Sequence, residues 1–464
     1  MTGREQLALT MLLALPDILA QLSMCLMSYI DAAMVGHLGS APAAAVGLVS
    51  TTTWIFGSFC YGSTSGFSVQ LAHRCGAKDF SGAREVFRKG LFCVLGISLL
   101  LAVLGIAISG SLPRWLGGSE EVLDDASGYF LIYALFLPVF QVAIFSEGCL
   151  ISSGNLKVPS MVSLVMCVLD VVFNWFFIFV LDMGARGAAL GTGIAELCSG
   201  TFLLTYVLTR SPELKHEGGF LQPVRRITGS FRSIRTAMSA VREDNAMVRG
   251  GIIGKALKIA WPLWLQNLVT RGAYICATVL IAPLGTIAIA ANSFAIIAEG
   301  FCYLPGYGMQ DAASTLVGQS LGAGRKDLAR RFSLMTILSG AGMMTALAVL
   351  MYAFAPQIMG LLSRDPEVIA LGASCLRIEA WAELLYGVSI VAGGCCIGAG
   401  DTLFPSMVNL VSMWVVRIGL ALFLIPRMGL TGYWVAMAVE LSVKGIVFAF
   451  RIRGNRWMKA RLVS

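Results

Sequence analysis

The sequence predicts an all-α protein that crosses a membrane many times and is built from two similar halves. Hydrophobic residues make up 57% of the 464 residues and charged residues only 13%, whereas a soluble domain has about 25% charged residues. Uncharged stretches such as 91–112 are long enough to cross about 30 Å of hydrocarbon as a helix. Motifs of the first half also return in the second. This composition disfavours a large soluble protein with a buried core.

Twelve candidate membrane helices follow from the hydrophobic runs between turn signals. In chain order they cover 9–35, 44–72, 89–112, 126–152, 159–181, 187–209, 253–281, 286–317, 332–358, 368–398, 404–426 and 429–450. Most of them are long enough to tilt in the membrane. The first run is too long for the core of a cleavable signal peptide and lacks a small-residue cleavage site, so we interpret it as the first membrane helix.

Basic residues gather in the loops on one side of the predicted membrane. The residues are Arg74, Lys78, Arg84, Arg88 and Lys89, then Arg325, Lys326, Arg330 and Arg331, then Arg451, Arg453, Arg456, Lys459 and Arg461, with ten more in the stretch 210–258. The opposite loops hold only Arg114, Arg186, Arg364 and Arg427. The positive-inside rule therefore places both termini in the cytoplasm of a plasma (cytoplasmic) membrane protein. This bias explains the net charge of +8 without a nucleic-acid partner.

The two halves repeat each other at an offset of about 246 residues. "GNLKVPSM" (154–161) matches "GDTLFPSM" (400–407), "LPDILAQL" (15–22) matches "WPLWLQNL" (261–268), and "GAKDFSGARE" (76–85) matches "GAGRKDLARR" (322–331) with a small gap. A six-helix unit crosses the membrane an even number of times, so both copies face the same way. We expect an N-lobe at 1–209 and a C-lobe at 253–464. The basic segment 210–252 between them is either an amphipathic helix on the membrane surface or a flexible linker.

At this point the chain resembles the multidrug and toxic compound extrusion (MATE) family. The motifs that carry the resemblance are the P-x-x-x-x-Q/N pattern in the first helix of each lobe, "DAAMVGHLG", "VGQSLGAGRKD" and the twin G-[ND]-x-x-x-P-S-M turns. The resemblance covers nearly the whole chain. It implies a cation-coupled antiporter that exports organic, often cationic, compounds. It also implies two six-helix lobes related by a pseudo-two-fold axis, with a V-shaped central cavity that alternates in exposure.

Acidic residues inside the N-lobe helices have no basic neighbours there. Asp31, Asp170 and Glu196 lie well inside its spans, and Lys89, the first residue of the third span, is the only Lys or Arg within the bounds given for them. A buried carboxylate without a basic partner is unfavourable in its charged form, so it is expected to bind a proton or a cation. Asp170 lies about 11 residues, or roughly 17 Å, into its span. Asp31 lies in the outer part of the first helix, so the two residues could meet just outside the membrane midplane.

Asp170 and Asn174 are four residues apart and share one face of the fifth helix. In one branch of the resembled family, an Asp of the first helix and an Asn/Asp pair of the fifth form the cation site, although the order of the pair is reversed here. The candidate site is therefore Asp31, Asp170, Asn174, Asn155 and Glu196, and the ion is H⁺ or Na⁺. A purely structural polar pair joining helices is the alternative for Asp170 and Asn174.

The C-lobe offers an alternative cation site at Glu299, Glu379, Glu383 and Gln266. Another branch of the family uses acids on the seventh and tenth helices, but the seventh helix here has Gln266 and no acid. The C-lobe acids have possible ion-pair partners in Arg271, Arg377, Arg417 and Lys444. Glu440 and Lys444 are spaced for an ion pair on one helix.

For the substrate cavity, the candidates are aromatic residues that could stack on an organic cation: Tyr61, Trp264, Tyr274 and Tyr303. Each could instead pack in the core or belong to an interfacial belt. The 12 cysteines show no metal-ligand spacing, and no phosphate-binding loop or nucleophile with a nearby base is present. We therefore expect no enzyme, no metal cluster and no cofactor beyond the coupling ion, in a monomer. Two other functions stay open: a flippase for lipid-linked precursors, with Arg271 and Arg417 facing the cleft, and an uncoupled channel.

Overall fold

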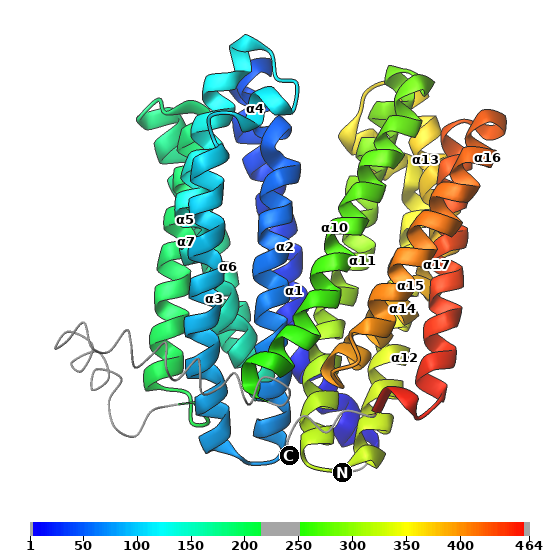
Figure 1. The fold of residues 1–464 in the computed structure, drawn as a ribbon. Helices are drawn as coiled ribbons and strands as arrows, with labels where there is room; N and C mark the ends of the chain where they lie inside the picture. The colour runs from blue at the N-terminus through cyan, green and yellow to red at the C-terminus, as the bar shows by residue number, and fades with distance from the viewer. Residues whose placement is uncertain (1–2, 215–250, 459–464) are drawn as a thin grey trace. The chain divides into compact units, whose positions relative to one another are not determined.

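The computed structural model describes residues 3–214 and 251–458, and every regular element in these ranges is a helix (Figure 1). Most of the basic segment 210–252 and the residues 459–464 lie outside the described part. The prediction of an all-α fold is confirmed. The long helices follow from continuous hydrophobic sequence, because a backbone in hydrocarbon must satisfy its hydrogen bonds within its own segment.

Two compact units make up the chain, and two helices belong to both. Of the described residues, 3–26 and 262–458 belong to the C-terminal unit, and 27–214 and 251–261 belong to the N-terminal unit. Helix α1 (Gly3–His37) and helix α10 (Ile252–Ile281) therefore each pass from one unit into the other. In α10 the division falls at Pro262, which cannot donate the helical hydrogen bond of its position.

The N-terminal unit packs five long helices besides its part of α1. They are α2 (Ser40–Gly76), α3 (Phe80–Ile108), α5 (Glu120–Ser153), α6 (Lys157–Trp175) and α7 (Gly184–Thr209), with a short α4 (Leu112–Trp115) between α3 and α5. Phe145 of α5 is fully buried, with its ring stacked on that of Phe87 and edge-on to that of Phe67. Helix α6 continues into a π-helical turn, η1 (Phe176–Val180).

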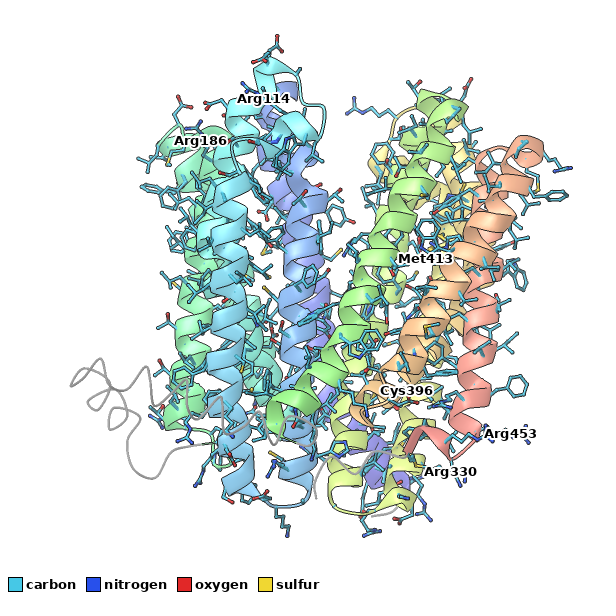
Figure 2. The ribbon with its side chains drawn as sticks, viewed as in Figure 1. Arg114, Arg186, Arg330, Cys396, Met413 and Arg453 are labelled. Atoms are coloured by element: carbon cyan, nitrogen blue, oxygen red, sulfur yellow. The ribbon has the colours of Figure 1, made fainter. Side chains whose placement is uncertain are left out.

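The C-terminal unit continues from α10 through the 3₁₀ turn η2 (Ala282–Leu284) into its own set of helices. They are α11 (Thr286–Gly322), α12 (Lys326–Leu362), α13 (Pro366–Ala380), α14 (Glu383–Gly398), α15 (Leu403–Val411), the π-helix η3 (Ser412–Ile418), α16 (Gly419–Met428), α17 (Leu430–Arg453) and the 3₁₀ turn η4 (Arg456–Met458). Arg330 and Arg453 lie at the same end of this unit (Figure 2), where Arg330 donates to the Arg453 carbonyl at 3.5 Å.

Ten helical segments in the described part are long and apolar enough to cross a membrane, and the pair α13 and α14, bent by 58°, makes an eleventh if it is counted as one span. Helix α17 covers the predicted twelfth span but does not meet the same criterion, and it carries Glu440 and Lys444 within its length. Large apolar side chains such as Leu100 and Leu338 are more than two thirds exposed. Such exposure suits contact with lipid chains.

The internal repeat is visible in the backbone as well as in the sequence. Left-handed or other positive φ angles recur at matching places in the two halves: Gly39 and Gly285, Lys78 and Gly324, Gly154 and Gly400. Each of these positions ends a helix or turns the chain between two helices, where a positive φ is most easily adopted by glycine. The duplicated backbone therefore uses the same turns at the same register.

The turn between α2 and α3 is held by Asp79, which lies outside the spans. Its carboxylate accepts hydrogen bonds from the Gly82 amide at 2.9 Å and from Arg74 at 2.6 Å. The bond from the Gly82 amide is the main reason that the pKa of Asp79 is lowered. Asp79 thus acts as the N-cap of α3.

Helix α17 packs closely on α14 at Gly445, which leaves no room for a side chain there. A Cβ atom at this position would lie 2.2 Å from the Leu385 carbonyl oxygen, so one helix has to move. We expect Gly445→Ala to lower the free energy of unfolding by about 1–3 kcal/mol, measured as a lower Tm of the detergent-purified protein. Gly342→Ala is the matched control, because a Cβ there meets nothing within 4 Å. Equal Tm values for the two variants would contradict the packing described here.

Candidate cation-binding site

Asn174 joins the two acidic residues of the N-terminal unit. Its amide nitrogen donates to Asp31 Oδ1 and to Asp170 Oδ2, both at 2.9 Å, and lies 3.4 Å from Thr192 Oγ1. Asp31 is near the end of α1, Asp170 and Asn174 share one face of α6, and Thr192 comes from α7. The two carboxyl groups also interact with each other electrostatically. Three helices thus bring two acids, an amide and a hydroxyl together.

Several oxygen atoms of this cluster have no donor. Asp170 and Asn174 are completely buried, and neither Asp170 Oδ1 nor Asn174 Oδ1 has a hydrogen-bond partner. In the described part of the chain, no ion pair includes Asp31 or Asp170. Buried oxygens without donors are costly unless a proton or cation binds them. The cluster can therefore share a proton between two carboxyl groups or bind a small cation through carboxylate and amide oxygens.

The local backbone permits this close approach. A Cβ atom at Gly191 would lie 2.1 Å from Asn174 Oδ1, so only glycine lets α7 pass so near the amide. The turn after Asn174 is the π-helix η1, and π-helical turns inside α-helices occur frequently at functional sites. Sequence reasoning missed Thr192. The run of small residues Gly191–Thr192–Gly193 was the available signal, since such runs let helices approach closely.

The other predicted N-lobe residues lie in different places. Glu196 is one turn beyond Thr192 on α7 and interacts electrostatically with Asp170 and with Glu147 of α5. Asn155 accepts a hydrogen bond from the Val158 amide at 3.2 Å, so it caps the start of α6 and is not part of the cluster around Asn174. Tyr129, which the sequence did not suggest, interacts electrostatically with both acids of that cluster.

Three glutamates of the C-terminal unit also meet. Carboxylate oxygens of Glu299, Glu379 and Glu383 all lie within 4.8 Å of one another, and all three residues are buried. Glu299 comes from α11, and the other two flank the break between α13 and α14. Gln266, predicted for the same site, instead accepts a hydrogen bond from Ser406 at 3.0 Å, and it is not among the residues that form this group.

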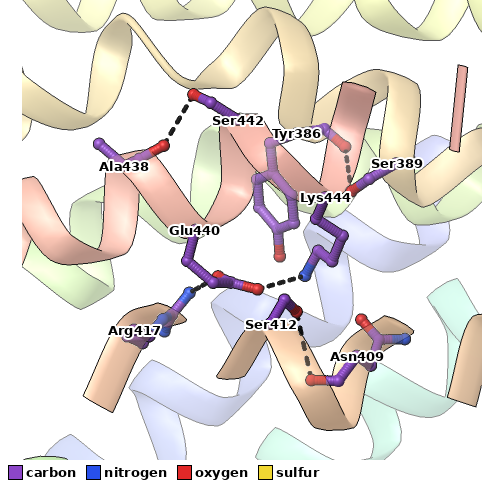
Figure 3. A network of polar contacts seen from close by, with 9 residues as sticks. All are labelled: Tyr386, Ser389, Asn409, Ser412, Arg417, Ala438, Glu440, Ser442 and Lys444. Atoms are coloured by element: carbon purple, nitrogen blue, oxygen red, sulfur yellow. Dashed lines mark hydrogen bonds and ion pairs between the residues drawn. The ribbon is translucent and has the colours of Figure 1, made fainter. Parts of the chain in front are cut away.

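The basic residues of the same unit bind a fourth acid, as Figure 3 shows. Arg417 donates to Glu440 Oε2 at 2.7 Å, and Lys444 lies 3.4 Å from Glu440 Oε1. The Lys444 ammonium also lies 5.4 Å from the centre of the Tyr386 ring. The expected ion pairing therefore holds for Glu440. Glu379 and Glu383 have no hydrogen-bond partner on either carboxylate oxygen.

The predicted substrate-contacting aromatics are divided between the units. Tyr61 lies on α2 of the N-terminal unit and is about half exposed, as is Tyr274 on α10 of the C-terminal unit. Tyr303 packs against Tyr307 and Tyr386, with ring centres 6.0 Å apart in each pair. Trp264 is half-buried on α10.

Comparison with known proteins gives one consistent result. The family model MatE matches residues 16–176 and 262–423. The probable multidrug resistance protein NorM of Chromobacterium violaceum is 27% identical, over 94% of this chain and 91% of that protein. Multidrug and toxin extrusion protein 1 of Mus musculus is 23% identical, over 98% of this chain and 76% of that protein.

Solved structures share the fold along the whole chain. A mutant of the Vibrio cholerae MATE transporter VcmN superposes with a TM-score of 0.87 and 18% identity, covering 99% of both chains. An outward-facing multidrug resistance MATE family transporter of the MOP superfamily gives 0.85 with 20% identity, covering 98% of both. A MOP superfamily transporter from Pyrococcus furiosus, whose binding pocket is described as reversed in polarity, also gives 0.85 with 19% identity, covering 98% of this chain and 96% of that one.

The hydrogen bonds of Asn174 predict its effect on stability. Asn174→Leu leaves the facing oxygens of Asp31 and Asp170 without their donor, so we expect the free energy of unfolding to fall by about 2 kcal/mol. Thr192→Val is the control, with an expected loss below about 1 kcal/mol because its contact with the amide is longer. Thermal unfolding in detergent measures both. An Asn174→Leu variant as stable as the wild type would show that the amide does not hold the two acids.

Proposed function

Because the chain belongs to the MatE family of membrane transporters, we propose that it is a secondary antiporter that exports organic, mainly cationic, compounds in exchange for H⁺ or Na⁺. The names of its relatives, which refer to multidrug resistance and toxin extrusion, support this substrate class. Transport would use alternating access. The protein would act as a monomer in the cytoplasmic membrane. Both termini would lie in the cytoplasm, because the basic loop residues gather on that side.

The observation that carries this proposal is the Asp31–Asn174–Asp170 cluster. Two acids at membrane depth, bridged by an amide and without a basic partner, form a site whose charge changes when a proton or Na⁺ binds. Binding from outside would neutralise the acids and let α1 repack. Release into the cytoplasm would restore the charge. Exchange follows if ion and substrate each weaken the binding of the other.

The glutamates of the C-terminal unit are the second candidate for the coupling site. The observation that favours them is the group of four carboxylate oxygens of Glu379 and Glu383 without a partner. The family resemblance supports this second site less directly. The branch that uses it has an acid on the seventh membrane helix, whereas α10, the corresponding helix here, carries no acid between Pro262 and Ile281. The two candidates lie in different units, so substitutions can separate them.

A flippase for lipid-linked precursors is the alternative function. It would need guanidinium groups available for a pyrophosphate. Arg417 is buried and bound to Glu440, so its charge is already matched by a carboxylate. This pairing favours the antiporter.

Dye efflux from vesicles tests the proposal and the identity of the ion. Vesicles are given an imposed pH gradient and then a sodium gradient, and the gradient that drives efflux identifies the ion. We expect Asp31→Asn to reduce driven efflux at least about tenfold, because an amide at this place cannot bind and release a proton or hold Na⁺ with a full charge.

Asp124→Asn is the matched control for this experiment. Asp124 is 91% exposed and pairs with Arg186 at the surface, so the same chemical change should leave efflux near the wild-type rate. Unchanged ion-driven efflux in Asp31→Asn would remove Asp31 from the mechanism. If Glu379→Gln alone abolished coupling, the second candidate would replace the first.

A further inference from the structure

Five exposed basic residues lie at the end of the C-terminal unit where α12 begins and α17 ends. Arg330, near the start of α12, donates to the carbonyl of Arg453 in the last turn of α17 at 3.5 Å (Figure 2). Arg456 follows in η4, which is tied back to α17 because the buried Trp457 donates from its indole nitrogen to the Ile452 carbonyl at 3.1 Å. The five residues are Lys326, Arg330, Arg331, Arg453 and Arg456.

Two acidic residues near this end already have basic partners. Asp327 accepts hydrogen bonds from Arg325 at 3.1 and 2.9 Å, and Asp401 pairs with Arg451. In the described part of the chain, no ion pair includes any of the five basic residues. The carboxylates of Asp327 and Asp401 therefore do not neutralise them. Basic residues held close together repel one another, so an anion bound among them is stabilising.

An exposed apolar stripe leads away from Arg453 along α17. Its residues are spaced three or four apart and share one face of the helix with Arg453, and they are Phe450, Ile446, Val443 and Val439. Phe450, the residue nearest Arg453 on this face, is 68% exposed. From Arg453 to Val439 the face is about 21 Å long at 1.5 Å per residue, which is longer than the roughly 15 Å depth of one hydrocarbon leaflet. An acyl chain can therefore lie along this face from the arginine inward.

The exposed face of α12 is built in the same way. Leu334 and Leu338 are 49% and 72% exposed, and their spacing places them on one face with Arg331, with Arg330 at the edge of that face. Each helix thus carries an arginine near its end and apolar side chains further in. This order matches that of a phospholipid, whose charged phosphate lies at the membrane surface above its acyl chains. Guanidinium groups suit the phosphate because they can donate two parallel hydrogen bonds to it.

We propose that this end of the C-terminal unit binds one anionic phospholipid. The guanidinium groups of Arg330, Arg453 and Arg456 bind its phosphate, its acyl chains lie along the apolar stripes of α12 and α17, and the lipid thereby holds the two helices together at this end. Clusters of basic residues at the ends of membrane helices attract anionic lipids. The apolar stripes that end at these arginines make a site for one lipid molecule out of that attraction. The inference requires that the chain lies in a membrane, and it does not depend on the proposed ion coupling.

Lipid binding to the purified full-length protein tests the site. The protein is stripped of lipid in detergent and titrated with phosphatidylglycerol, and the bound lipid is counted by native mass spectrometry. We expect the first phosphatidylglycerol to bind at least about tenfold more tightly than phosphatidylcholine with the same acyl chains, because the choline group cancels the charge of the phosphate. Equal affinity for the two lipids would overturn the proposal. Arg330→Gln with Arg453→Gln should weaken the binding of phosphatidylglycerol at least about tenfold.

Arg88→Gln with Arg210→Gln is the matched control. Both arginines are exposed residues of the N-terminal unit, so this variant loses the same charge at a different place. Its affinity for phosphatidylglycerol should stay within about twofold of the wild type, since charges more than a Debye length away are largely screened. If both double variants lost affinity equally, general attraction to a basic surface would explain the binding, and the proposal would fail. The Tm of each variant checks that it is folded.

Two further measurements define what the site recognises. Glycerophosphoglycerol, which is the same headgroup without acyl chains, should not displace phosphatidylglycerol at about a hundredfold excess, because it cannot bury apolar surface on the two stripes. Displacement would show that the stripes take no part and would overturn the proposal. Asp31→Asn should bind phosphatidylglycerol as the wild type does even where it loses ion-driven efflux, so failure of the antiporter proposal and failure of the lipid site give different results.

Discussion

Acidic side chains inside membrane helices are the constraint on which the rest of this structure depends. Hydrocarbon offers no water to stabilise a carboxylate, so each buried acid needs a donor, a base or a bound cation. The N-terminal unit meets this need with the amide of Asn174, which bridges Asp31 and Asp170. The C-terminal unit meets it differently, by pairing Glu440 with Arg417 and Lys444. The first arrangement leaves Asp31 and Asp170 without a fixed positive charge, so a proton or cation can bind and leave; the pairing of Glu440 does not allow this exchange.

The two halves share a backbone arrangement but differ in the charged residues that they bury. Glycines and turns recur at the same register in both halves, yet the residue that corresponds to Asp31 at the repeat offset is Ala277, and Asp170 corresponds to Val416, next to Arg417. The backbone repeat is set by turn geometry and by helix packing, which constrain few positions. Polar side chains at membrane depth were free to diverge between the copies, because each cluster needs only to be neutral within its own unit.

Much of the architecture could be predicted from the sequence, because hydrophobic length and the repeat determine spans and family, and the family comparison confirms the resemblance. The contact of Asp31 with Asp170 and Asn174 could also be predicted. Asp170 and Asn174 are spaced to share one face of α6, and the acids inside the N-lobe helices have no basic neighbours there. Thr192 and Tyr129 were missed because the site was predicted from acidic residues without basic partners, and an uncharged side chain in an apolar run does not show that pattern. The break at 381–382 could not be predicted because no Gly or Pro marks it. Asn155 caps a helix, and in the sequence alone a capping Asn cannot be distinguished from a polar residue of a binding site.

The course of α1 links the candidate ion site to both units. This helix belongs to the C-terminal unit up to Leu26 and to the N-terminal unit from Met27 onward, and Asp31 lies about one turn beyond that division. A proton or cation at Asp31 changes the charge of a residue next to the point where the helix passes from one unit to the other. A ligand can shift a conformational equilibrium only by as much as its binding differs between the two states. Because α1 runs through both units, its strain or repacking carries this difference in binding free energy to both of them.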